Sequence, residues 1–351
     1  MFSHPEFDDH ETVVFSRDEA SGLTAIIAVH NTALGPGFGG CRMWPYGDEE
    51  AALRDVLRLS AGMTYKAAIC ELPYGGGKSV IIGDAGSQKT PALLGAMGRL
   101  VEGLGGLYII ADDVGTTLDD LAVMRTETAH TAATTAAAGE PLAVTAHGVA
   151  RAMEAAAAFA FGRSDLVGLR VAVQGLGNVG LPLCRYLRDR GADLTVCDID
   201  PERLALARRE LSPKIVPAED IYDRDVDVFA PCAFGAVLND ETIPRLRAKV
   251  VCGGANNQLL RGEHDAALAA RGILYVPDYL ANAGGVIDFH MEHINDNPEA
   301  VLDAVGRIGE ITADTLARAH AQGETPLQQT DRLVHQRLDA ARAAQLSSPP
   351  D

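Results

Sequence analysis

Two short stretches of the sequence contain residue types that could do chemistry. The first, PYGGGKS at 73–79, places Lys78 directly behind three glycines. The second, GLGNVG at 175–180, follows the apolar run RVAVQ and precedes a helical pattern. Glycines in such runs let the backbone come close to a phosphate or to a reacting group. The two stretches therefore predict a nucleotide site, a reactive lysine, or both.

PYGGGKS has the composition of a phosphate-binding P-loop but not its spacing. A P-loop requires glycine at position 72, where this chain has Leu72, and it leads from a strand into a helix. Here the order is reversed, because a helical pattern precedes Lys78 and the apolar run SVIIG follows it. We therefore interpret the three glycines as a close backbone approach to the substrate, which presents Lys78 to it.

A second lysine, Lys66, lies in the stretch GMTYKAA among small and apolar residues. If Lys66 and Lys78 share a cleft, each lowers the pKa of the other, and burial lowers both. A lysine that acts as a base near neutral pH needs its pKa to fall from about 10.4 to about 7–8. The alternative is that both ammonium groups simply extend to the surface.

The GLGNVG stretch has the sequence context of a dinucleotide fingerprint. Gly175 permits the tight turn, Gly177 lets the backbone approach a pyrophosphate, and Gly180 lets the helix pack on the strand. Asp198 ends the next predicted strand, where a carboxylate binds the ribose 2′-hydroxyl and repels a 2′-phosphate. The pattern therefore predicts NAD as the cofactor. Arg203 either softens that preference or is solvated.

Short apolar strands alternate with helical patterns in the second half of the chain. The predicted strands are 170–175, 193–200, 227–232, 249–255 and 272–278, and the predicted helices are 145–162, 178–191 and most of 298–344. This alternation predicts a parallel sheet with both faces covered. In the first third we predict a strand at 24–31 that runs into a Gly/Pro-rich loop, and then a helix at 48–72. The Ala/Thr-rich stretch before residue 145 predicts a connection.

The bulk composition narrows the class of partner. At 351 residues and 47% hydrophobic residues, the chain is long enough for two globular domains. A net charge of −18 disfavours nucleic acid and anionic membranes as partners. With no signal-peptide pattern and no apolar run of membrane-spanning length, we expect a cytoplasmic protein. The six cysteines form no C-x-x-C pair, so we expect buried thiols and no metal site.

Several motifs, in order along the chain, resemble one enzyme family. They are LGPGFGGCRMWPY, LRLSAGMTYKAA, LPYGGGKSVIIGD, YIIADDVGTT, VAVQGLGNVG, VFAPCAFGAVLND, GGANNQL and YVPDYLANAGGVI. These motifs closely resemble the Glu/Leu/Phe/Val dehydrogenases, the leucine and valine branch most of all, and the resemblance runs from about Val14 to Arg342. It implies NAD-dependent, reversible oxidative deamination of an L-amino acid to a 2-oxo acid and ammonia. It also implies a homo-oligomer.

The resemblance implies roles for individual residues. Lys78 matches the lysine that activates water and shuttles protons, and Lys66 matches the lysine that binds the substrate carboxylate. Asp113 matches the carboxylate that engages the amino group. Cofactor contacts are implied at Arg42, Thr145, Gly175, Leu176, Gly177, Asn178, Val179, Gly180, Asp198, Arg203, Cys232, Ala233, Ala255, Asn256 and Asn257. Substrate contacts are implied at Lys66, Gly39, Gly40, Asn257, Phe38, Ala111, Val286 and Phe289.

The last four of these positions correspond to the side-chain pocket. Leucine-type relatives usually carry smaller aliphatic residues where Phe38 and Phe289 stand. Two phenylalanines either fill volume and favour a compact aliphatic side chain, or rearrange to stack on an aromatic one. Because an apolar pocket separates neighbours that differ by one methylene by only about 1–3 kcal/mol, we expect overlapping activity on leucine, isoleucine and valine. The stretch DFHMEHINDNPEAV, which follows NAGGVI, departs from the usual continuation.

We therefore expect an α/β fold of two domains with a cleft between them. Residues 1–135 form a substrate-binding and oligomerisation domain, 136–325 form a Rossmann-type NAD-binding domain, and 326–351 form a C-terminal helix that packs back across the hinge. Two alternative functions are an aromatic (phenylalanine or tryptophan) L-amino-acid dehydrogenase of the same family and a catalytically silent NAD-binding protein. The presence of Lys66, Lys78 and Asp113 disfavours the silent protein.

Overall fold

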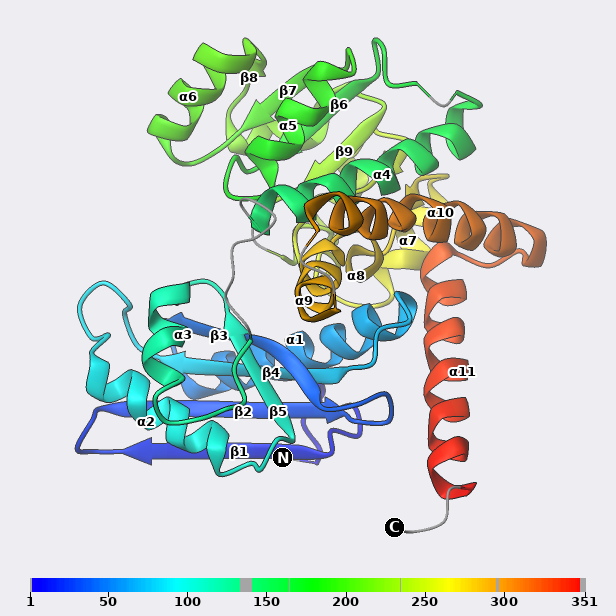
Figure 1. Cartoon of the computed structure of the whole chain (residues 1–351). Coiled ribbons are helices and arrows are strands. Elements are labelled where there is room, and N and C mark those ends of the chain that lie inside the picture. Colours follow the sequence, from blue (N-terminus) through cyan, green and yellow to red (C-terminus); the bar gives the residue numbers. More distant parts are fainter. Residues whose placement is uncertain (1, 133–140, 164, 234, 295–296, 348–351) are drawn as a thin grey trace. The chain divides into compact units, whose positions relative to one another are not determined.

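The computed structural model describes residues 2–132, 141–163, 165–233, 235–294 and 297–347. The chain forms two compact units (Figure 1). The first comprises Met1–Thr134 together with Val334–Asp351, and the second comprises Thr135–Leu333. The connection predicted before residue 145 lies largely outside the described residues. No helix in the described ranges is long and apolar enough to cross a membrane.

The first unit contains a mixed five-stranded sheet with the order β1-β2-β4-β3-β5. Its strands are β1 (Thr12–Asp18), β2 (Leu23–Asn31), β3 (Gly37–Trp44), β4 (Gly75–Ile82) and β5 (Tyr108–Asp112). The pairs β3–β4 and β3–β5 are parallel, whereas β2 runs antiparallel to both β1 and β4. The parallel strands β3, β4 and β5 therefore end at one edge of the sheet, and Asp113 directly follows β5.

Helices cover both faces of this sheet. On one face, Ala52 and Val56 of α1 (Glu49–Ile69) pack in one apolar cluster with Ile26 and Val80 of the strands. On the other face, α2 (Pro91–Glu102) and α3 (Leu118–Met124) pack on strand residues such as Ile81. Asp48 begins α1 by accepting a hydrogen bond from the backbone N–H of Ala51, as expected for an N-cap carboxylate. The helix predicted at 48–72 is therefore confirmed, but it is shorter at its C-terminal end.

The Gly/Pro-rich segment that we predicted to be a loop is in part the strand β3. The prediction was wrong because the glycines here serve a close approach of two strands, which a sequence pattern does not report. A Cβ atom at Gly39 would lie 1.8 Å from the carbonyl oxygen of Gly77 in β4. A side chain at this position would therefore separate β3 from β4.

The three glycines of β4 are packed against protein atoms, and our expectation that they approach the substrate stays a prediction. A Cβ at Gly75 would lie 1.9 Å from the carbonyl oxygen of Asn31, and one at Gly76 would lie 2.1 Å from Oγ1 of Thr64 in α1. A Cβ at Gly77 would lie 2.5 Å from the ring of Tyr108. The glycines therefore allow α1 and the neighbouring strands to reach β4.

The second unit contains a six-stranded sheet, and all its strand pairs are parallel. Its strands are β6 (Arg170–Gln174), β7 (Asp193–Cys197), β8 (Lys214–Ile215), β9 (Val228–Pro231), β10 (Val250–Val251) and β11 (Leu274–Tyr275). The order β11-β10-β9-β6-β7-β8 reverses direction between β6 and β9. This is the strand order of the Rossmann fold, in which ligands bind where the order reverses. The predicted parallel sheet is confirmed.

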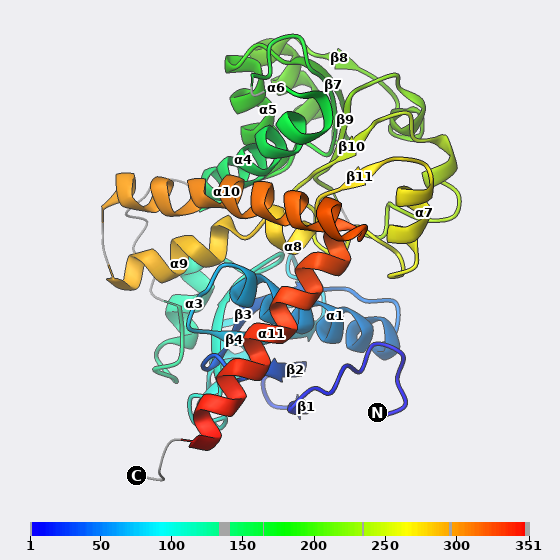
Figure 2. The same cartoon turned by 90° about the vertical axis from the view of Figure 1, so that its right-hand side faces the viewer.

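The helices of the second unit complete this fold. They are α4 (Pro141–Phe161), α5 (Gly180–Asp189), α6 (Pro201–Leu211), α7 (His264–Ala270), α8 (Asp278–Ala281), α9 (Gly284–Ile294) and α10 (Pro298–Gln322), with short 3-10 helices η1 (Ala218–Asp223) and η2 (Ile243–Arg245). Figure 2 shows α10 running along α4. The two helices come close at Gly148 and Gly309, where a Cβ would lie 2.7 Å from Ile308 and 3.1 Å from the carbonyl of Arg151.

The last helix, α11 (Pro326–Ser347), begins in the second unit and belongs to the first from Val334 onward. Within the first unit, its Arg337 binds the C-terminal end of α1. The guanidinium donates hydrogen bonds to the carbonyl oxygens of Ala68 and Ile69 at 2.7 and 2.8 Å, and it pairs with Glu71 at 2.6 Å. A side chain from the far end of the sequence therefore caps α1.

The six cysteines are free thiols. Cys41, Cys184, Cys197 and Cys252 are buried, as predicted, whereas Cys70 and Cys232 are partly exposed as residues. Burial raises the pKa of the Cys197 thiol to about 11 and that of Cys41 to about 12. These two thiols therefore stay protonated at neutral pH and act as small apolar side chains.

Candidate active site

Lys78 lies in the middle of β4, on the face of the sheet that α1 covers. Side chains alternate along a strand, so Lys78 shares a face with Gly76, which meets α1, and with Val80, which packs on α1. Its side chain is 7% exposed, and Nζ lies 2.7 Å from Oδ2 of Asp113. A buried ammonium group is therefore held against a carboxylate at the edge where β5 ends.

The loop after β5 fixes Asp113 in this position. Its backbone N–H donates to Oγ1 of Thr116 at 3.0 Å, and that hydroxyl donates to the carbonyl of Cys41 in β3 at 2.7 Å. Gly115 turns the chain with φ of +83°, and a Cβ there would lie 2.0 Å from the carbonyl of Met43. The carboxylate is thus tied through its own backbone to the strand beside Lys78.

A second cation binds the same carboxylate. Nε of Arg42 lies 3.2 Å from Oδ2 of Asp113, the oxygen that Lys78 also contacts. Burial alone would raise the pKa of Asp113, but the charges of Lys78 and Arg42 outweigh it and hold that pKa well below its usual range. Asp113 is therefore ionised at any pH at which the protein works, so it accepts hydrogen bonds and does not donate them.

Lys66 lies in the last turn of α1 and is buried, with 9% exposure. Two residues earlier, Thr64 contacts the Gly76 position of β4, so this turn of the helix is pressed against the strand that carries Lys78. The charged partner of Lys78 in the first unit is Asp113. The mutual effect that we expected between Lys66 and Lys78 stays a prediction.

Because Gly40 has no side chain, the charged pair of Lys78 and Asp113 can occupy the space beside it. A Cβ at this position would lie 2.6 Å from the carbonyl of Asp112, 2.8 Å from Cβ of Asp113 and 3.1 Å from Nζ of Lys78. Gly39 serves the contact between β3 and β4 described above. Of these two predicted substrate-contacting glycines, Gly40 adjoins the lysine and Gly39 packs against the neighbouring strand.

The predicted pocket residues divide between the two units. Phe38 of β3 is 5% exposed, and its ring lies 5.6 Å from that of Tyr74. Ala111 of β5 pairs in register with Gly40. In the second unit, Val286 and Phe289 are buried residues of α9. Their assignment to one pocket stays a prediction.

The glycine fingerprint forms a tight turn between β6 and α5. Gly175 has φ of +94°, and a Cβ there would lie 2.9 Å from Ala233. A Cβ at Gly180 would lie 1.9 Å from the carbonyl of Gly175 and 3.1 Å from Cβ of Cys232. The turn thus brings together predicted cofactor residues that follow β6 and β9, at the point where the strand order reverses.

The same turn fits the pyrophosphate of a dinucleotide. Among the described residues, a Cβ at Gly177 would meet within 4 Å only Nη1 of Arg203, at 3.4 Å, so that side of the turn is open. No described side chain caps the N-terminus of α5, whose N-cap residue is Val179. Uncapped N–H groups at a helix N-terminus, together with the helix dipole, form an anion site. Leu176 and the exposed Asn178 complete the turn.

Asp198 follows β7 and is already held by backbone groups. Its Oδ2 accepts a hydrogen bond from the N–H of Leu176 at 2.6 Å, and its Oδ1 accepts one from Asp200 at 2.8 Å. Arg203 lies 3.3 Å from Asp200 and 4.0 Å from Asp198, and half of its side chain is exposed. The carboxylate is therefore oriented over the glycine turn, with one half-exposed cation beside it.

The segment after β10 contains the remaining predicted cofactor contacts. Asn257 has φ of +51°, an uncommon conformation for a residue with a side chain. Asn256 is exposed and its Oδ1 accepts a hydrogen bond from Asn282 at 2.8 Å, while Ala255 is buried. Thr145 of α4 lies at the start of α9, 3.3 Å from a Cβ placed on Gly285.

Residues that support these segments were missed in the sequence. In the first unit, Asp55 accepts hydrogen bonds from both Arg42 and Tyr46. In the second unit, Gln258 donates to the carbonyls of Gly253 and Ala255, and its own N–H donates to Asp278. Tyr46 and Gln258 lie inside the quoted motifs, whereas Asp55 lies outside them and gave no signal.

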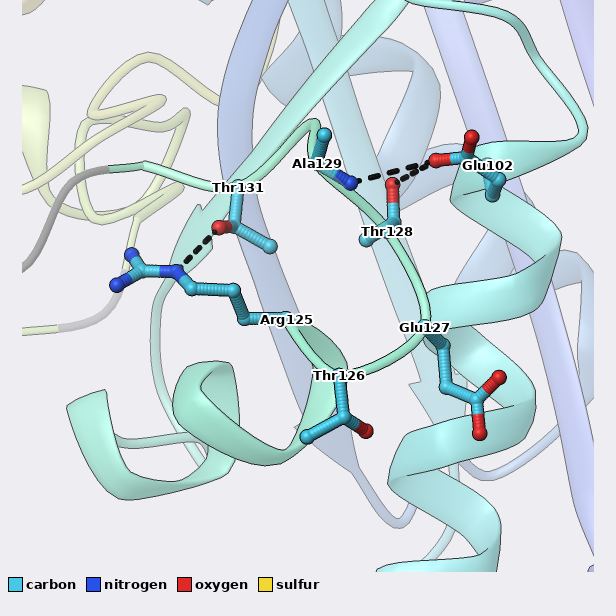
Figure 3. Close-up of a pocket in the computed structure, with 7 residues that line it drawn as sticks. All are labelled: Glu102, Arg125, Thr126, Glu127, Thr128, Ala129 and Thr131. Atoms are coloured by element: carbon cyan, nitrogen blue, oxygen red, sulfur yellow. Dashed lines mark hydrogen bonds between the residues drawn. The ribbon is translucent and has the colours of Figure 1, made fainter.

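A separate pocket of about 490 Å³ lies on the first unit, outside this site (Figure 3). Figure 3 shows hydrogen bonds among several of its polar groups: Glu102 accepts hydrogen bonds from Thr128 and Ala129, and Arg125 donates to Thr131. Its charged side chains do not converge on a common point, so no ligand is inferred for it.

A Rossmann-type domain joined in one chain to an α/β domain that buries a lysine–carboxylate pair suits a dinucleotide-dependent enzyme such as a dehydrogenase. Comparisons with known proteins agree. Residues 10–130 match the family model described as Glu/Leu/Phe/Val dehydrogenase, dimerisation domain, and residues 195–341 match the model described as Glutamate/Leucine/Phenylalanine/Valine dehydrogenase. The chain belongs to this family of amino acid dehydrogenases, which are oxidoreductases.

Individual relatives are similar over nearly their whole length. Leucine dehydrogenase of Bacillus subtilis (strain 168) is 45% identical, covering 97% of this chain and 95% of the relative. Phenylalanine dehydrogenase of Bacillus thermotolerans is 43% identical, covering 95% and 90%. The crystal structure of L-tryptophan dehydrogenase from Nostoc punctiforme superposes with a TM-score of 0.78 at 41% identity, covering 95% of this chain and 97% of that chain.

Proposed function

We propose that the protein catalyses the NAD-dependent, reversible oxidative deamination of a branched-chain L-amino acid to the 2-oxo acid and ammonia. The observation that carries this proposal is the ion pair between Lys78 and Asp113, 2.7 Å long and largely buried. A lysine base beside a carboxylate that stays ionised is what the deamination of an amino acid requires. The relatives named leucine dehydrogenase support the substrate class.

Each charged residue has one task in this proposal. Lys66 binds the substrate carboxylate and so orients the α-carbon. Because the carbon is already held in place, less entropy is lost in the chemical step. Asp113 accepts hydrogen bonds from the substrate amino group and stabilises the cationic iminium that forms when hydride leaves. Lys78 takes the proton from the water that adds to this carbon, and for this step its ammonium group must first have given up a proton to become a neutral amine. NAD, when bound, accepts the hydride.

The cofactor proposal is NAD and not NADP. The oriented carboxylate of Asp198 would bind a ribose 2′-hydroxyl and repel a 2′-phosphate. Arg203 offers a positive charge nearby, but it pairs with Asp200 at 3.3 Å. Equal kcat/KM values with NAD and NADP would contradict this part of the proposal.

The experiment is a substrate panel. Purified protein with NAD and each L-amino acid at alkaline pH should produce NADH absorbance with leucine, isoleucine and valine. Because the proposed pocket residues are apolar, their kcat/KM values should differ by no more than about 10- to 200-fold. Silence across all L-amino acids would refute the proposed reaction.

A second candidate is the aromatic substrate class. Phe38 and Phe289 are both buried, and relatives named phenylalanine and L-tryptophan dehydrogenase are also similar to this chain. Rings that rearrange to stack on the substrate would favour an aromatic side chain. The ratio of kcat/KM for phenylalanine or tryptophan to that for leucine decides between the two classes.

We also propose that the protein is a homo-oligomer, because residues 10–130 match a model described as a dimerisation domain. Light scattering of the purified protein should give a mass that is a multiple of 37.0 kDa. A monomer mass at micromolar concentration would contradict this.

A further inference from the structure

Arg42 stands between two carboxylates of the first unit. Its Nη1 lies 2.8 Å from Oδ2 of Asp55 in α1, and its Nε lies 3.2 Å from Oδ2 of Asp113. The side chains of Arg42 and Asp55 are 17% and 24% exposed. The two carboxylates therefore fix the guanidinium at two different nitrogens, and its orientation is defined.

Tyr46 adds a second bond to Asp55. Its hydroxyl donates to Oδ2 of Asp55 at 2.6 Å. Burial and the neighbouring carboxylate of Asp55 both raise the pKa of Tyr46, so the hydroxyl remains a donor throughout the working pH range. Asp55 is thus held in place from one side by Tyr46 and holds Arg42 on the other.

The contacts on Asp113 are unequal. Lys78 lies 2.7 Å from Oδ2, and Arg42 donates its one described hydrogen bond on Asp113 to the same oxygen. The backbone N–H of Val114 is a further donor to this carboxylate. An arginine side chain free to turn pairs with a carboxylate through two parallel bonds, because its planar fork matches both oxygens. Arg42 does not pair with Asp113 in this way, and the bond from its Nη1 to Asp55 accounts for the difference.

We propose that Asp55 is a positioning residue for the amino-acid site: it holds Arg42 on a single oxygen of Asp113 and so leaves the other oxygen to the substrate amino group. This inference rests on the proposed function. It assigns Arg42 a task within the first unit in addition to the cofactor contact that the family resemblance implies. Without Asp55, Arg42 turns to bind both oxygens of Asp113 and competes with the substrate for them.

The first test is structural and needs no turnover. A crystal structure of the Asp55→Asn variant should show Arg42 paired with both oxygens of Asp113, whereas the wild-type structure keeps the single Nε contact. A variant structure in which the single contact persists would overturn the inference, even if the wild-type protein proved inactive on every amino acid. That inactivity would refute the proposed function separately.

The second test is kinetic. Asp55→Asn should lower kcat/KM for the amino acid about ten- to a hundredfold, as misplacement of a reacting group does. Glu50→Gln is the matched control, since it removes an exposed carboxylate from the same helix and should leave kcat/KM within about twofold. If the two variants behave alike, Asp55 has no positioning role.

A double-mutant cycle shows whether Asp55 acts through Arg42. Arg42→Lys replaces the planar guanidinium by a single ammonium group, which cannot pair with both oxygens of Asp113 through two parallel bonds. In that background, Asp55→Asn should change kcat/KM by less than about threefold, because the two residues act as one unit. Additive losses would contradict the inference.

Tyr46→Phe is the milder variant if Asp55→Asn does not fold, as judged by circular dichroism. It removes one hydrogen bond to Asp55 and keeps the carboxylate charge. A loss of about two- to fivefold in kcat/KM is expected, in line with one hydrogen bond of about 0.5–1 kcal/mol. An unchanged kcat/KM would count against the inference.

Discussion

Gly40 of β3 adjoins Lys78 of β4 so closely that a methyl group at Gly40 would lie 3.1 Å from Nζ of the lysine. The same methyl group would lie 2.8 Å from Cβ of Asp113 and 2.6 Å from the carbonyl of Asp112. The lysine can move away, but the backbone carbonyl cannot. The backbone of β3 and the Lys78–Asp113 pair are therefore packed so closely that even a methyl group at Gly40 lacks room.

Gly40→Ala should consequently impair the site more than the fold. The added methyl group separates Asp113 from Lys78, and we expect kcat/KM for the amino acid to fall at least about tenfold. Gly47→Ala is the control, because a Cβ at Gly47 meets nothing within 4 Å. Steady-state kinetics of both variants checks the prediction, which fails if Gly40→Ala is as active as Gly47→Ala.

Lys78→Ala should abolish turnover while NAD binding survives. Loss of a general base costs about 10²–10⁴ in rate, and the glycine turn that we propose for NAD belongs to the other unit. Initial rates and an NAD titration by fluorescence measure the two properties separately. Full activity of the variant would disprove the assigned role, and loss of NAD affinity would show that the substitution acts more widely.

The buried carboxyl group of Asp288 in α9 should make the free energy of unfolding depend on pH. Its side chain is 4% exposed, Oδ1 has no hydrogen-bond partner among the described residues, and burial raises its pKa to about 6. In the unfolded chain the pKa is about 3.9. The folded state therefore binds more protons between about pH 4 and 6, so this contribution to stability is lost as the pH rises through that window.

Asp288→Asn removes this titration. We expect the variant to be more stable than the wild type by about 1–3 kcal/mol at pH 7.5, because no buried charge is left without a partner. The gain should shrink at pH 4.5, where most of the wild-type carboxyl is already neutral in the folded state. Thermal unfolding of both proteins at the two pH values gives the answer, and an equal difference at both would contradict the assignment.

Arg337→Ala should loosen the last turn of α1. The variant leaves the carbonyls of Ala68 and Ile69 without their partner, at a cost of about 1–3 kcal/mol. Because Lys66 lies in the same turn, we also expect KM for the amino acid to rise more than kcat falls. Arg342→Ala on the same helix is the control, since its pair with Asp339 is 3.7 Å long and largely exposed. Similar Tm values for the two variants would argue against the cap.

The Rossmann-type half could be predicted from sequence because its signals are local. The strand RVAVQ, the glycines at 175–180 and the carboxylate at 198 follow one another within thirty residues, and the structure orders them as the pattern requires. Strand lengths were less predictable. For example, β10 is only Val250–Val251, because apolar residues continue past the last ladder hydrogen bond.

The first unit was harder to predict because its contacts join residues far apart in the chain. No local sequence pattern shows that a side chain at Gly39 would clash with the carbonyl oxygen of Gly77. For this reason the glycine-rich part of β3 was mistaken for a loop. The contacts of the glycines before Lys78 with Asn31, Thr64 and Tyr108 were not foreseen for the same reason. Likewise, Asp55 gave no signal, since its partner Arg42 lies on another element.

The contact between α11 and α1 determines when the first unit can finish folding during synthesis. Residues 1–134 are synthesised before Arg337, which caps α1 and follows the whole second unit in the chain. Domains generally fold as they emerge, the N-terminal one first. Here the end of α1 that carries Lys66 stays uncapped while the whole second unit is translated. The first unit is therefore completed only after Arg337 has been synthesised, and a chain cut short before Val334 keeps every residue of the charged site but lacks the segment that caps α1.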